Sequence, residues 1–321
     1  MKLAQLFDSL PEEDEIYDLL IVTFGDEPRA INIVNKFQIN SKLKIAVRCG
    51  TNEQACDENK QYFYRKGFTE VSAVNIIENL LLFLQKFEAK KLRVLFDITC
   101  CDRSVMASVF LVLHNASCLD SLHLQVCYSL ALFTKPQLTT TPNEAIQPVH
   151  PGFAGWPSEQ SYPTSLITGL GYEPEKAEGA SEYLDPTEQW GFVPISPVTE
   201  FLVELESNNR SLISRLGQEK RLVHYEVASP SRTFGQLELV IADLLRRSNP
   251  ILLPFGPKIF FALCLIQSLR HAEIGVWHVT SEPMPSGAYH VASGIEIGFT
   301  SIFSGEDDYI DDFCGSDDGP A

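Results

Sequence analysis

A short pattern that occurs twice constrains the fold of this 321-residue chain most strongly. An apolar run ends in Gly-x-Glu-Pro at 25–28, and another does so at 171–174. In each copy the apolar run is typical of a buried strand, and the glycine permits a tight turn. The proline stands where a helix can begin without losing a hydrogen bond. Each copy therefore predicts a strand, a turn and a helix, in that order.

The same order of elements follows each copy. After the first copy we expect a helix to Phe37, strands over 44–48, 70–74, 93–98 and 122–128, and helices over 52–66, 76–87 and 103–113. After the second copy we expect a helix to Tyr183, strands over 189–194, 222–227, 251–254 and 274–279, and helices over 198–216, 234–247 and 258–269. Strands that alternate with helices form parallel sheets through crossover connections. The predicted fold class is α/β, with two tandem Rossmann-like parallel-sheet halves related by internal duplication.

A proline-rich stretch and an acidic end divide the chain further. Residues 134–163 contain six prolines, a density that excludes regular helix or central strand and predicts a linker. Residues 305–321 contain seven Asp or Glu and no Lys or Arg, which favours a disordered acidic tail. The tail serves solubility or docks a partner. The expected organisation is a first half at 1–133, the linker, a second half at 164–304, and the tail.

Composition excludes several kinds of partner. The chain has 25 Lys and Arg against 42 Asp and Glu, a net charge of −17, which repels a nucleic-acid backbone, so we expect no direct DNA binding. The eight cysteines lack paired CxxC spacing and fit a reducing cytoplasm. The apolar run at 75–84 is about half of the ~20 residues that a membrane span needs. We therefore expect a soluble, cytoplasmic protein, and no motif predicts a metal or a resident cofactor.

Candidate ligand-binding residues lie on the loops that follow the predicted strands, because open parallel sheets bind ligands beyond the carboxyl ends of their strands. In the first half these residues are Thr23, Gly25, Glu27, Arg29, Asp97, Thr99 and Arg103, and in the second half they are Gly171, Glu173, Lys176, Gly256 and Lys258. Four of these residues are cations at or near helix starts, where the helix dipole disfavours positive charge. This placement suggests an anion between them. Two alternatives stay open: the cations are solvated and pair with neighbouring acids, and Glu27 caps its own helix.

The segment 95–106, LFDITCCDRSVM, resembles the CRISPR-associated Rossmann fold (CARF) family. Members of that family have a strand that ends in Asp-x-Thr, a small turn, and then a basic residue and a Met that open a helix. The family's Thr-x-Gly turn is similar to Thr23-Phe24-Gly25. The resemblance implies that both loops hold a cyclic oligonucleotide at a two-fold interface, lined here by Thr23, Gly25, Asp97, Thr99 and Arg103. Cys100-Cys101 departs from the family's Gly-Gly turn, and their role is open.

We therefore expect a ligand-sensing or regulatory protein that binds a nucleotide-type anion between its two halves and passes the signal to a partner protein. The resemblance adds a cyclic oligonucleotide as ligand and prokaryotic antiviral defence as context. A phosphodiesterase acting at the same place is one alternative, with Arg103 or Lys258 stabilising the charge that develops in the transition state. Asp97 is the best candidate for a catalytic carboxylate. A non-catalytic adaptor subunit of a multi-protein complex is another. Tyr289 and His290 follow the last predicted strand and would overhang the same strand ends.

Overall fold

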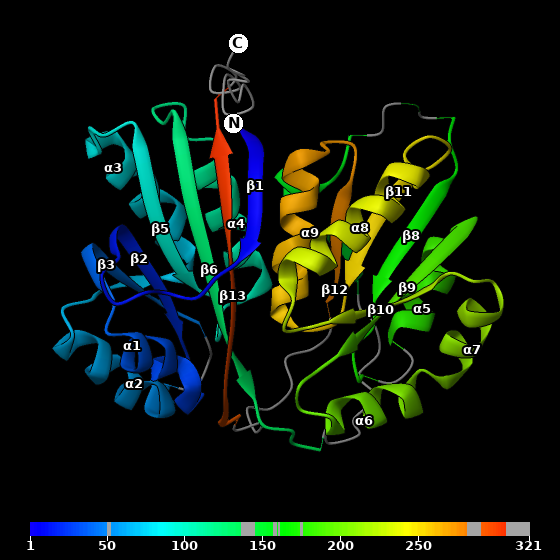
Figure 1. Ribbon diagram of the computed structural model, residues 1–321, viewed down its shortest axis with the longest axis horizontal. Helices are drawn as coiled ribbons and strands as arrows, with labels where there is room; N and C mark the ends of the chain where they lie inside the picture. Colours follow the sequence, from blue (N-terminus) through cyan, green and yellow to red (C-terminus); the bar gives the residue numbers. More distant parts are fainter. Residues whose placement is uncertain are drawn as a thin grey trace, which may run out of the picture.

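Two β-sheets with largely parallel strands lie side by side in the computed structural model, each flanked by helices (Figure 1). The structure describes residues 1–49, 53–135, 145–156, 159, 161–173, 176–280 and 290–305, with the backbone alone for 53–56. The predicted fold class, two tandem Rossmann-like halves, is confirmed.

The first sheet has seven strands in the order β1-β13-β6-β5-β2-β3-β4. Their bounds are β1 Lys2–Asp8, β2 Ile16–Phe24, β3 Asn40–Arg48, β4 Thr69–Ser72, β5 Lys91–Asp97, β6 Ser121–Ala131 and β13 Ala292–Ser304. The five strands from β6 to β4 are parallel, whereas β13 runs antiparallel to both β6 and β1.

The second sheet has six strands in the order β10-β9-β8-β11-β12-β7. Their bounds are β7 Ala145–Pro148, β8 Thr164–Gly169, β9 Glu188–Ile195, β10 Leu222–Glu226, β11 Asn249–Pro254 and β12 Gly275–Thr280. All are parallel except β7, which is antiparallel to β12. Counted within each half, the parallel strands of both sheets follow the order third, second, first, fourth, fifth. The duplication predicted from the sequence is therefore matched by the topology.

Helices connect the parallel strands, as crossovers require. The first half contains α1 Asn32–Phe37, α2 Glu53–Arg65, α3 Ile76–Lys86 and α4 Arg103–His114, with 3₁₀ turns at Pro28–Ile31 and Ala73–Asn75. The second half contains α5 Lys176–Leu184, α6 Glu200–Asn208, α7 Arg210–Gln218, α8 Pro230–Leu244 and α9 Lys258–Arg270, preceded by a 3₁₀ turn at Pro151–Phe153. Within the described ranges, no helix has the length and apolar character needed to cross a membrane.

Two strands do not follow the division expected along the sequence. The range 164–304 includes β13, yet β13 pairs with β6 and β1 of the first sheet. The range expected as a linker, 134–163, includes β7, which pairs with β12 at the edge of the second sheet. Pro148 ends β7, and an edge strand tolerates a proline because one of its sides makes no ladder bonds. The last strand thus ties the end of the second half to the first.

Helix α9 lies at the centre of the molecule. Its residues Ile259–Ser268 are all buried, which fits a helix that is hydrophobic on all sides. It packs against α4 of the first half and α8 of the second. Buried side chains of α4 and α9 belong to one hydrophobic core that reaches both sheets. The two halves are therefore joined by a continuous core as well as by β13.

The single helix expected over 198–216 is wrong. Two helices, α6 and α7, occupy this stretch and meet at Asn209. The Asn209 side-chain amide donates to the carbonyl oxygens of Gly171 at 2.8 Å and Leu205 at 2.9 Å. Side chains of this type compete for backbone partners and favour helix ends, so Asn209 separates the helices and holds the turn after β8.

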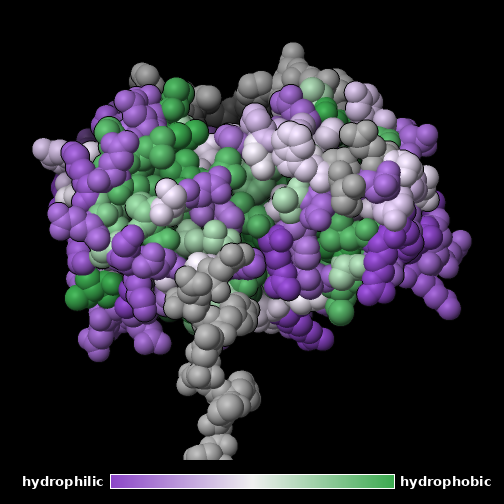
Figure 2. Space-filling view, turned by 90° about the horizontal axis from the view of Figure 1, so that it is seen from above, coloured by the Kyte–Doolittle hydropathy of each residue, from purple (hydrophilic) through white to green (hydrophobic). Residues whose placement is uncertain are grey.

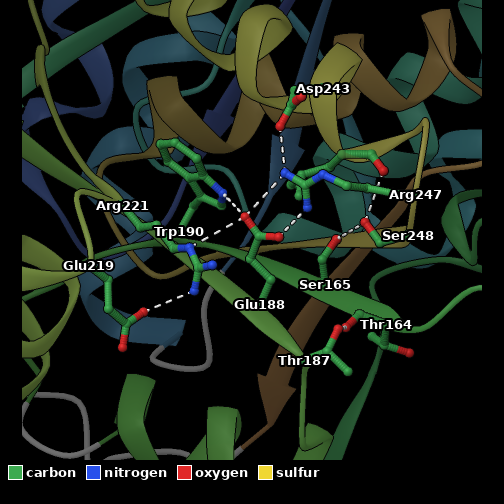
Figure 3. Close-up of polar contacts among 11 residues, drawn as sticks. Thr164, Ser165, Thr187, Glu188, Trp190, Glu219, Arg221, Asp243, Arg247 and Ser248 are labelled. Carbon is green, nitrogen blue, oxygen red and sulfur yellow. Dashed lines mark hydrogen bonds and ion pairs between the residues drawn. The ribbon is translucent and has the colours of Figure 1, made fainter.

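A charged network closes the amino-terminal edge of the second sheet (Figure 3). Glu188 at the start of β9 accepts a hydrogen bond from the Trp190 indole at 2.9 Å and forms ion pairs with Arg247 and with Arg221, the latter at 3.4 Å. Arg247 also pairs with Asp243 at 2.5 Å. Burial opposes ionisation of Glu188, but the bonds from Arg247 and Trp190 and the nearby positive charges lower its pKa overall. The network keeps a partly buried carboxylate charged.

The amino-terminal edges of the two halves differ in surface character. Figure 2 looks onto this edge and shows hydrophobic side chains gathered on the side of the first half, whereas the second half is mostly hydrophilic. Leu81 and Leu82 of α3 are among the exposed apolar residues of the first half. The charged network around Glu188 lies at the corresponding edge of the second half.

Candidate functional site

The starts of α4 and α9 meet where the two halves join, and we call this region the seam. The Lys258 ammonium, on the first residue of α9, donates to the carbonyl oxygen of Thr99 at 2.9 Å. The Arg103 guanidinium, on the first residue of α4, donates to the carbonyl oxygen of Phe255 at 3.1 Å. Thr99 follows β5 and Phe255 follows β11. The contacts are reciprocal, so the carboxyl ends of the two sheets face each other at the seam.

Both helix starts lack a capping side chain. Asp102 and Pro257 occupy the N-cap positions of α4 and α9, and neither makes a side-chain capping bond. The first N–H groups of a helix have no partner within it and carry the positive end of its dipole. Two such ends therefore converge beside Arg103 and Lys258, which gives the seam a positive potential in a chain of net charge −17.

Asp97 places a buried carboxyl group beside these cations. It ends β5 and is 0% exposed. One oxygen accepts from the Thr99 backbone N–H at 2.9 Å, whereas Oδ2 has no hydrogen-bond partner. Burial raises the pKa of Asp97 to about 7, although the bonds from Thr99 and the charges of Arg29 and Lys258 oppose the rise. A buried polar atom without a partner is costly and marks a place where a ligand or a proton is accommodated.

Arg29 is fixed against the first sheet rather than free at the surface. It is buried, pairs with Glu27, and donates to the carbonyl oxygen of Ser129 at 2.9 Å. Its guanidinium also lies 5.6 Å from the ring centroid of Tyr128. Glu27 is the N-cap residue of the 3₁₀ turn and makes no side-chain capping bond. The capping alternative for Glu27 is therefore wrong, because its carboxylate pairs with Arg29 instead.

Two more polar atoms at the seam lack a partner. The Tyr225 hydroxyl is buried without a hydrogen bond, and the ring of Tyr225 stacks on Phe260 with centroids 4.7 Å apart. The Nδ1 atom of His290 is also buried and unpartnered. Burial lowers the pKa of His290, as do Arg29 and Lys258, against the opposing charge of Glu27. His290 is therefore within the electrostatic influence of the same charged residues.

Aromatic side chains from both halves lie beside the charged residues. Phe133, which follows β6, makes an edge contact with Phe201 of α6 at 5.2 Å between ring centroids. Phe201 in turn contacts Tyr172, which follows β8, at 6.1 Å. All three rings are half-buried. Burial raises the pKa of Tyr172, with a further contribution from Glu173 and a smaller one from Tyr128.

Of the candidate residues, Thr99, Arg103 and Lys258 contact the seam directly, and Asp97 lies next to Thr99. Glu27 and Arg29 form an ion pair on the first sheet, and the charge of Arg29 acts on Asp97. Gly256 lies at the seam too, since a Cβ atom on it would stand 3.2 Å from the Tyr225 hydroxyl and 3.0 Å from the Leu170 carbonyl oxygen. Gly256 therefore allows two backbone turns to approach closely.

The other candidate residues serve the surrounding framework. Thr23 is fully buried, and its hydroxyl donates to the Asp97 carbonyl oxygen at 3.2 Å. The Gly25 carbonyl oxygen accepts from the Asn59 amide at 2.8 Å. A Cβ atom on Gly171 would approach the Phe255 carbonyl oxygen to 3.0 Å. Thr23, Gly25 and Gly171 thus stabilise the turns that follow β5, β2 and β8 through contacts with neighbouring residues.

Glu173 and Lys176 form an ion pair of 3.5 Å at the rim. Glu173 is half exposed. Burial lowers the pKa of Arg103, and Glu173 and Tyr172 oppose this effect, so Glu173 lies near enough to act on the seam. For Lys176 the alternative of an ion pair with a neighbouring acid holds.

Cys100 and Cys101 are buried in the turn that precedes α4. Burial raises the pKa of both thiols. A thiol becomes a nucleophile only as the thiolate, so these environments suit packing rather than nucleophilic chemistry. The Cys101 thiol also donates to the carbonyl oxygen of Asp102 at 3.3 Å.

The sequence did not single out Tyr128, Tyr172, Tyr225, Phe133 or Phe201. Apart from Phe201, which lies on α6, they lie in or just after strands. This was the available signal, and aromatic residues are equally common in cores. Tyr289 lies outside the described residues. In the part of the chain that the structure describes, no three His, Cys, Asp or Glu side chains gather as a metal site.

A pocket of about 450 Å³ lies away from the seam, between α2 and the first sheet. Phe24, Phe63 and Phe68 form its apolar wall, and Lys60 and Glu70 form an ion pair at its edge. It adjoins the start of α2, where side chains are not described.

Comparison with known proteins finds similarity at the level of structure. No protein-family model matches the sequence, and no curated protein matches it. Among solved structures, the chain is similar to the cytoplasmic domain of a prokaryotic cation chloride cotransporter, with 10% sequence identity and a TM-score of 0.23, over 83% of this chain and 96% of that one.

Proposed function

We propose that this protein is a ligand-sensing or regulatory protein that binds a small nucleotide-type anion at the seam between its two Rossmann-like halves. One observation carries the proposal: two uncapped helix starts, each with a cation, meet beside a buried carboxyl oxygen that has no partner. Helix starts with nearby cations are a common setting for phosphate groups.

The cations are available to a phosphate because their present partners are neutral. Lys258 and Arg103 each donate to a backbone carbonyl oxygen. A charged phosphate oxygen forms a shorter and stronger bond with such a donor than a neutral carbonyl does. Ligand binding would therefore replace the reciprocal contacts across the seam. This exchange would couple the ligand to the relative position of the two halves.

The aromatic residues favour a nucleotide over a bare inorganic anion. Phe133, Tyr172 and Phe201 contribute half-buried rings from segments of both halves. Bases stack on aromatic side chains with little dependence on their identity. Asp97 adds an oxygen that would accept a hydrogen bond from a ribose hydroxyl, since Oδ2 has no partner within the described protein.

The resemblance of 95–106 to CARF proteins supports the same class of ligand and makes it more specific. It points to a cyclic oligonucleotide bound by Asp97, Thr99 and Arg103, in prokaryotic antiviral defence. A regulatory protein of this kind would pass its signal to a protein partner.

A cyclic-nucleotide phosphodiesterase is the second candidate. It is favoured by the pKa of Asp97, which burial raises to about 7, near the value that suits proton transfer at neutral pH. In such a reaction Asp97 would take the proton of a ribose 2′-hydroxyl as that oxygen bonds to phosphorus, the P–O5′ bond would break, and the 5′-oxygen would leave with a proton from water, while Lys258 would stabilise the charge on the phosphoryl oxygens. If the protein is this enzyme, liquid chromatography of the incubated ligand will separate the opened product from the isomeric ring, and Asp97→Asn will still bind the ligand without opening it.

A thermal-shift screen of the full chain tests the proposed function. The panel contains mononucleotides, nicotinamide dinucleotides, and cyclic di- and oligonucleotides. A ligand specific to the folded state adds about 2.7 kcal/mol of stability at one hundred times its Kd. We expect a shift with at least one nucleotide that Lys258→Met reduces. Lys42→Met is the matched control, because Lys42 is an exposed lysine paired with Asp18 away from the seam. The absence of any shift would contradict the proposal and favour the adaptor alternative.

A further inference from the structure

The buried carboxyl group of Asp97 is influenced by cations of both halves. The residue is 0% exposed, and one of its carboxyl oxygens accepts from the Thr99 backbone N–H at 2.9 Å. The other oxygen, Oδ2, has no hydrogen-bond partner within the described ranges. A buried carboxyl group keeps its proton unless hydrogen bonds or positive charges stabilise the ionised form. The charges around Asp97 therefore determine whether it holds a proton.

Cations from two elements act on this carboxyl group. Arg29, in the 3₁₀ turn after β2, and Lys258, on the first residue of α9, both oppose the rise in the pKa of Asp97 that burial causes. Arg29 already pairs with Glu27. Lys258 instead donates to the neutral carbonyl oxygen of Thr99, and it forms no ion pair with the described part of the chain. Lys258 is therefore the cation whose charge a bound anion would neutralise.

The other groups that face Asp97 stay neutral above pH 7. Thr23 of β2 donates its hydroxyl to the Asp97 carbonyl oxygen at 3.2 Å. Cys127 of β6 pairs with Asp97 in strand register, Cys100 lies in the turn after β5, and burial raises the pKa of both thiols. Burial lowers the pKa of His290, which is influenced by the same cations, below its ordinary value of 6.5. Among these groups, Asp97 is the one that titrates above pH 7.

We propose that an anion bound at Lys258 makes Asp97 take up one proton, so that the seam binds its ligand and a proton together. This inference rests on the proposed function and adds its regulation by pH. The phosphate charge would cancel the positive charge of Lys258 that favours the carboxylate, and it would also repel the carboxylate directly. The proton comes from water and forms an O–H bond at Oδ2, and no other covalent bond changes.

Thr99 connects the two charged groups. Its carbonyl oxygen accepts from the Lys258 ammonium and its N–H donates to the Asp97 carboxyl group, each at 2.9 Å. A phosphate that draws Lys258 away from Thr99 thus acts one residue from the carboxyl group. The protonated Oδ2 donates one hydrogen bond and can still accept another. The contact with a ribose hydroxyl is therefore kept when Asp97 is neutral.

The proposal determines the sign of the pH dependence. Burial raises the pKa of Asp97 to about 7 in the free protein, against the bonds from Thr99 and the two cations, and the anion raises it further. Below the free value the proton is present with or without the ligand, so affinity does not change with pH. Between the free and bound values, affinity falls by up to about tenfold per pH unit as pH rises. A protonated Asp97 cannot act as the base of a phosphodiesterase, so proton uptake also favours the sensor.

Infrared spectroscopy of the ligand-free full chain tests the coupling between Lys258 and Asp97. The C=O band of a protonated carboxyl group, taken as the difference from the same protein with Asp97→Asn, reports the proton on Asp97. Other carboxyl groups cancel, including the seven of 306–321, which lie outside the described residues. Lys258→Met imitates neutralisation by an anion and should raise the midpoint of the titration by about one pH unit. Lys42→Met, which removes a lysine that pairs with Asp18, should leave it unchanged.

Calorimetry with cyclic di-AMP tests proton uptake on binding. The phosphodiester groups of this probe do not titrate near neutral pH, so the protein must accept any proton that is taken up. Binding enthalpies in buffers with different ionisation enthalpies should show roughly half a proton taken up per ligand at about pH 7.5, for a shift of about one pH unit. Asp97→Asn should bind the probe with the same enthalpy in both buffers after correction for dilution.

Three results would overturn the proposal. The first is an Asp97 titration midpoint that is the same with and without the charge of Lys258. The second is binding of cyclic di-AMP to the unsubstituted chain without any buffer dependence. The third is a buffer dependence that persists in Asp97→Asn, because another group would then take the proton. A chain that binds no nucleotide would contradict the proposed function instead, and the infrared titration would still test the coupling because it needs no ligand.

Discussion

The two halves share a strand order but differ in what lies at the carboxyl ends of their strands. In the first half, β5 ends on the buried carboxyl group of Asp97 and continues to Thr99. In the second half, β11 ends on Pro254 and continues to Phe255, and the nearby Tyr225 stacks on Phe260. The end of β5 is polar and charged, whereas the end of β11 is apolar and aromatic and is followed by the cation Lys258.

This difference shows which part of a duplicated fold is free to change. Strand order depends on apolar faces and on alternation of strands with helices, and both halves keep these. The residues at the carboxyl ends of the strands do not contribute to the apolar faces or to the alternation of strands and helices. The two halves can therefore carry different residues at these strand ends. A ligand at the seam would meet two unlike surfaces, with the buried carboxyl group of Asp97 on the first half and the stacked rings of Tyr225 and Phe260 on the second. The predictions below test this asymmetry.

The largest expected effect concerns the apolar half. Phe260→Ala removes a ring that stacks on Tyr225 and fills the space beside Gly169. We expect a loss of about 3–5 kcal/mol in the free energy of unfolding, measured by chemical denaturation. Val105→Ala is the control at the corresponding third residue of α4, and its loss should be smaller. Equal losses would mean that the two helix starts are packed alike.

Asp97→Asn tests the polar half through pH. Burial raises the pKa of Asp97 to about 7, whereas an unfolded Asp titrates near 3.9. Between these values the native state holds a proton that the unfolded state releases, so the wild-type protein loses stability as pH rises through the window. Asn does not titrate, so the variant does not lose stability in this way. As pH rises through this window, the unfolding free energy of the variant should increase by up to about 1.4 kcal/mol per pH unit relative to that of the wild-type protein. A pH-independent difference would contradict a buried, proton-holding Asp97.

Glu188→Gln tests the opposite edge of the second half. The charged hydrogen bonds from Arg247 and Trp190 stabilise the ionised carboxylate and lower its pKa against the effect of burial. We expect a loss of about 1–3 kcal/mol at neutral pH. Because the native pKa is depressed, this contribution is complete above the pKa of an unfolded Glu and is lost as pH falls through the lower native value. We would measure the unfolding free energy of both proteins at several pH values. A difference between wild type and variant that is the same at pH 7 and at pH 3 would argue against the network.

The smallest effect concerns the reciprocal contacts. Lys258→Met and Arg103→Met each remove one hydrogen bond to a carbonyl oxygen of the other half. We expect each to cost about 0.5–1.5 kcal/mol in unfolding free energy. Similar costs support an equivalent role in joining the halves. A large cost for only one of them would show that the seam is held from one side.

Much of the fold follows from local sequence signals. The Gly-x-Glu-Pro pattern and alternating strands and helices predict the parallel strands of both sheets. They do not predict β13, because it pairs with residues of β1 that are about 300 positions away and with residues of β6 that are more than 150 positions away. Nor do they predict the break at Asn209, which depends on a bond to Gly171. Long-range pairing and tertiary hydrogen bonds leave no local periodicity.

The residues of the candidate site that follow predicted strands could be chosen from the sequence. Asp97, Arg103 and Lys258 lie at strand ends or at the helix starts that follow, and the structure brings them together. The aromatic residue Tyr225 was not predictable, because its proximity to Gly256 depends on how two loops of the second half approach each other. The reciprocal bonds of Arg103 and Lys258 were also hidden, since they require the packing of α4 on α9.

Calorimetric titration of the full chain with the nucleotide that gives the largest thermal shift tests the central claim most directly. Loss of a charge-assisted contact should weaken binding about 10- to 100-fold in Lys258→Met and in Arg103→Met. Lys42→Met, in which the substituted lysine lies away from the seam, should bind as the wild-type protein does. Equal affinity in all four proteins would contradict binding at the seam.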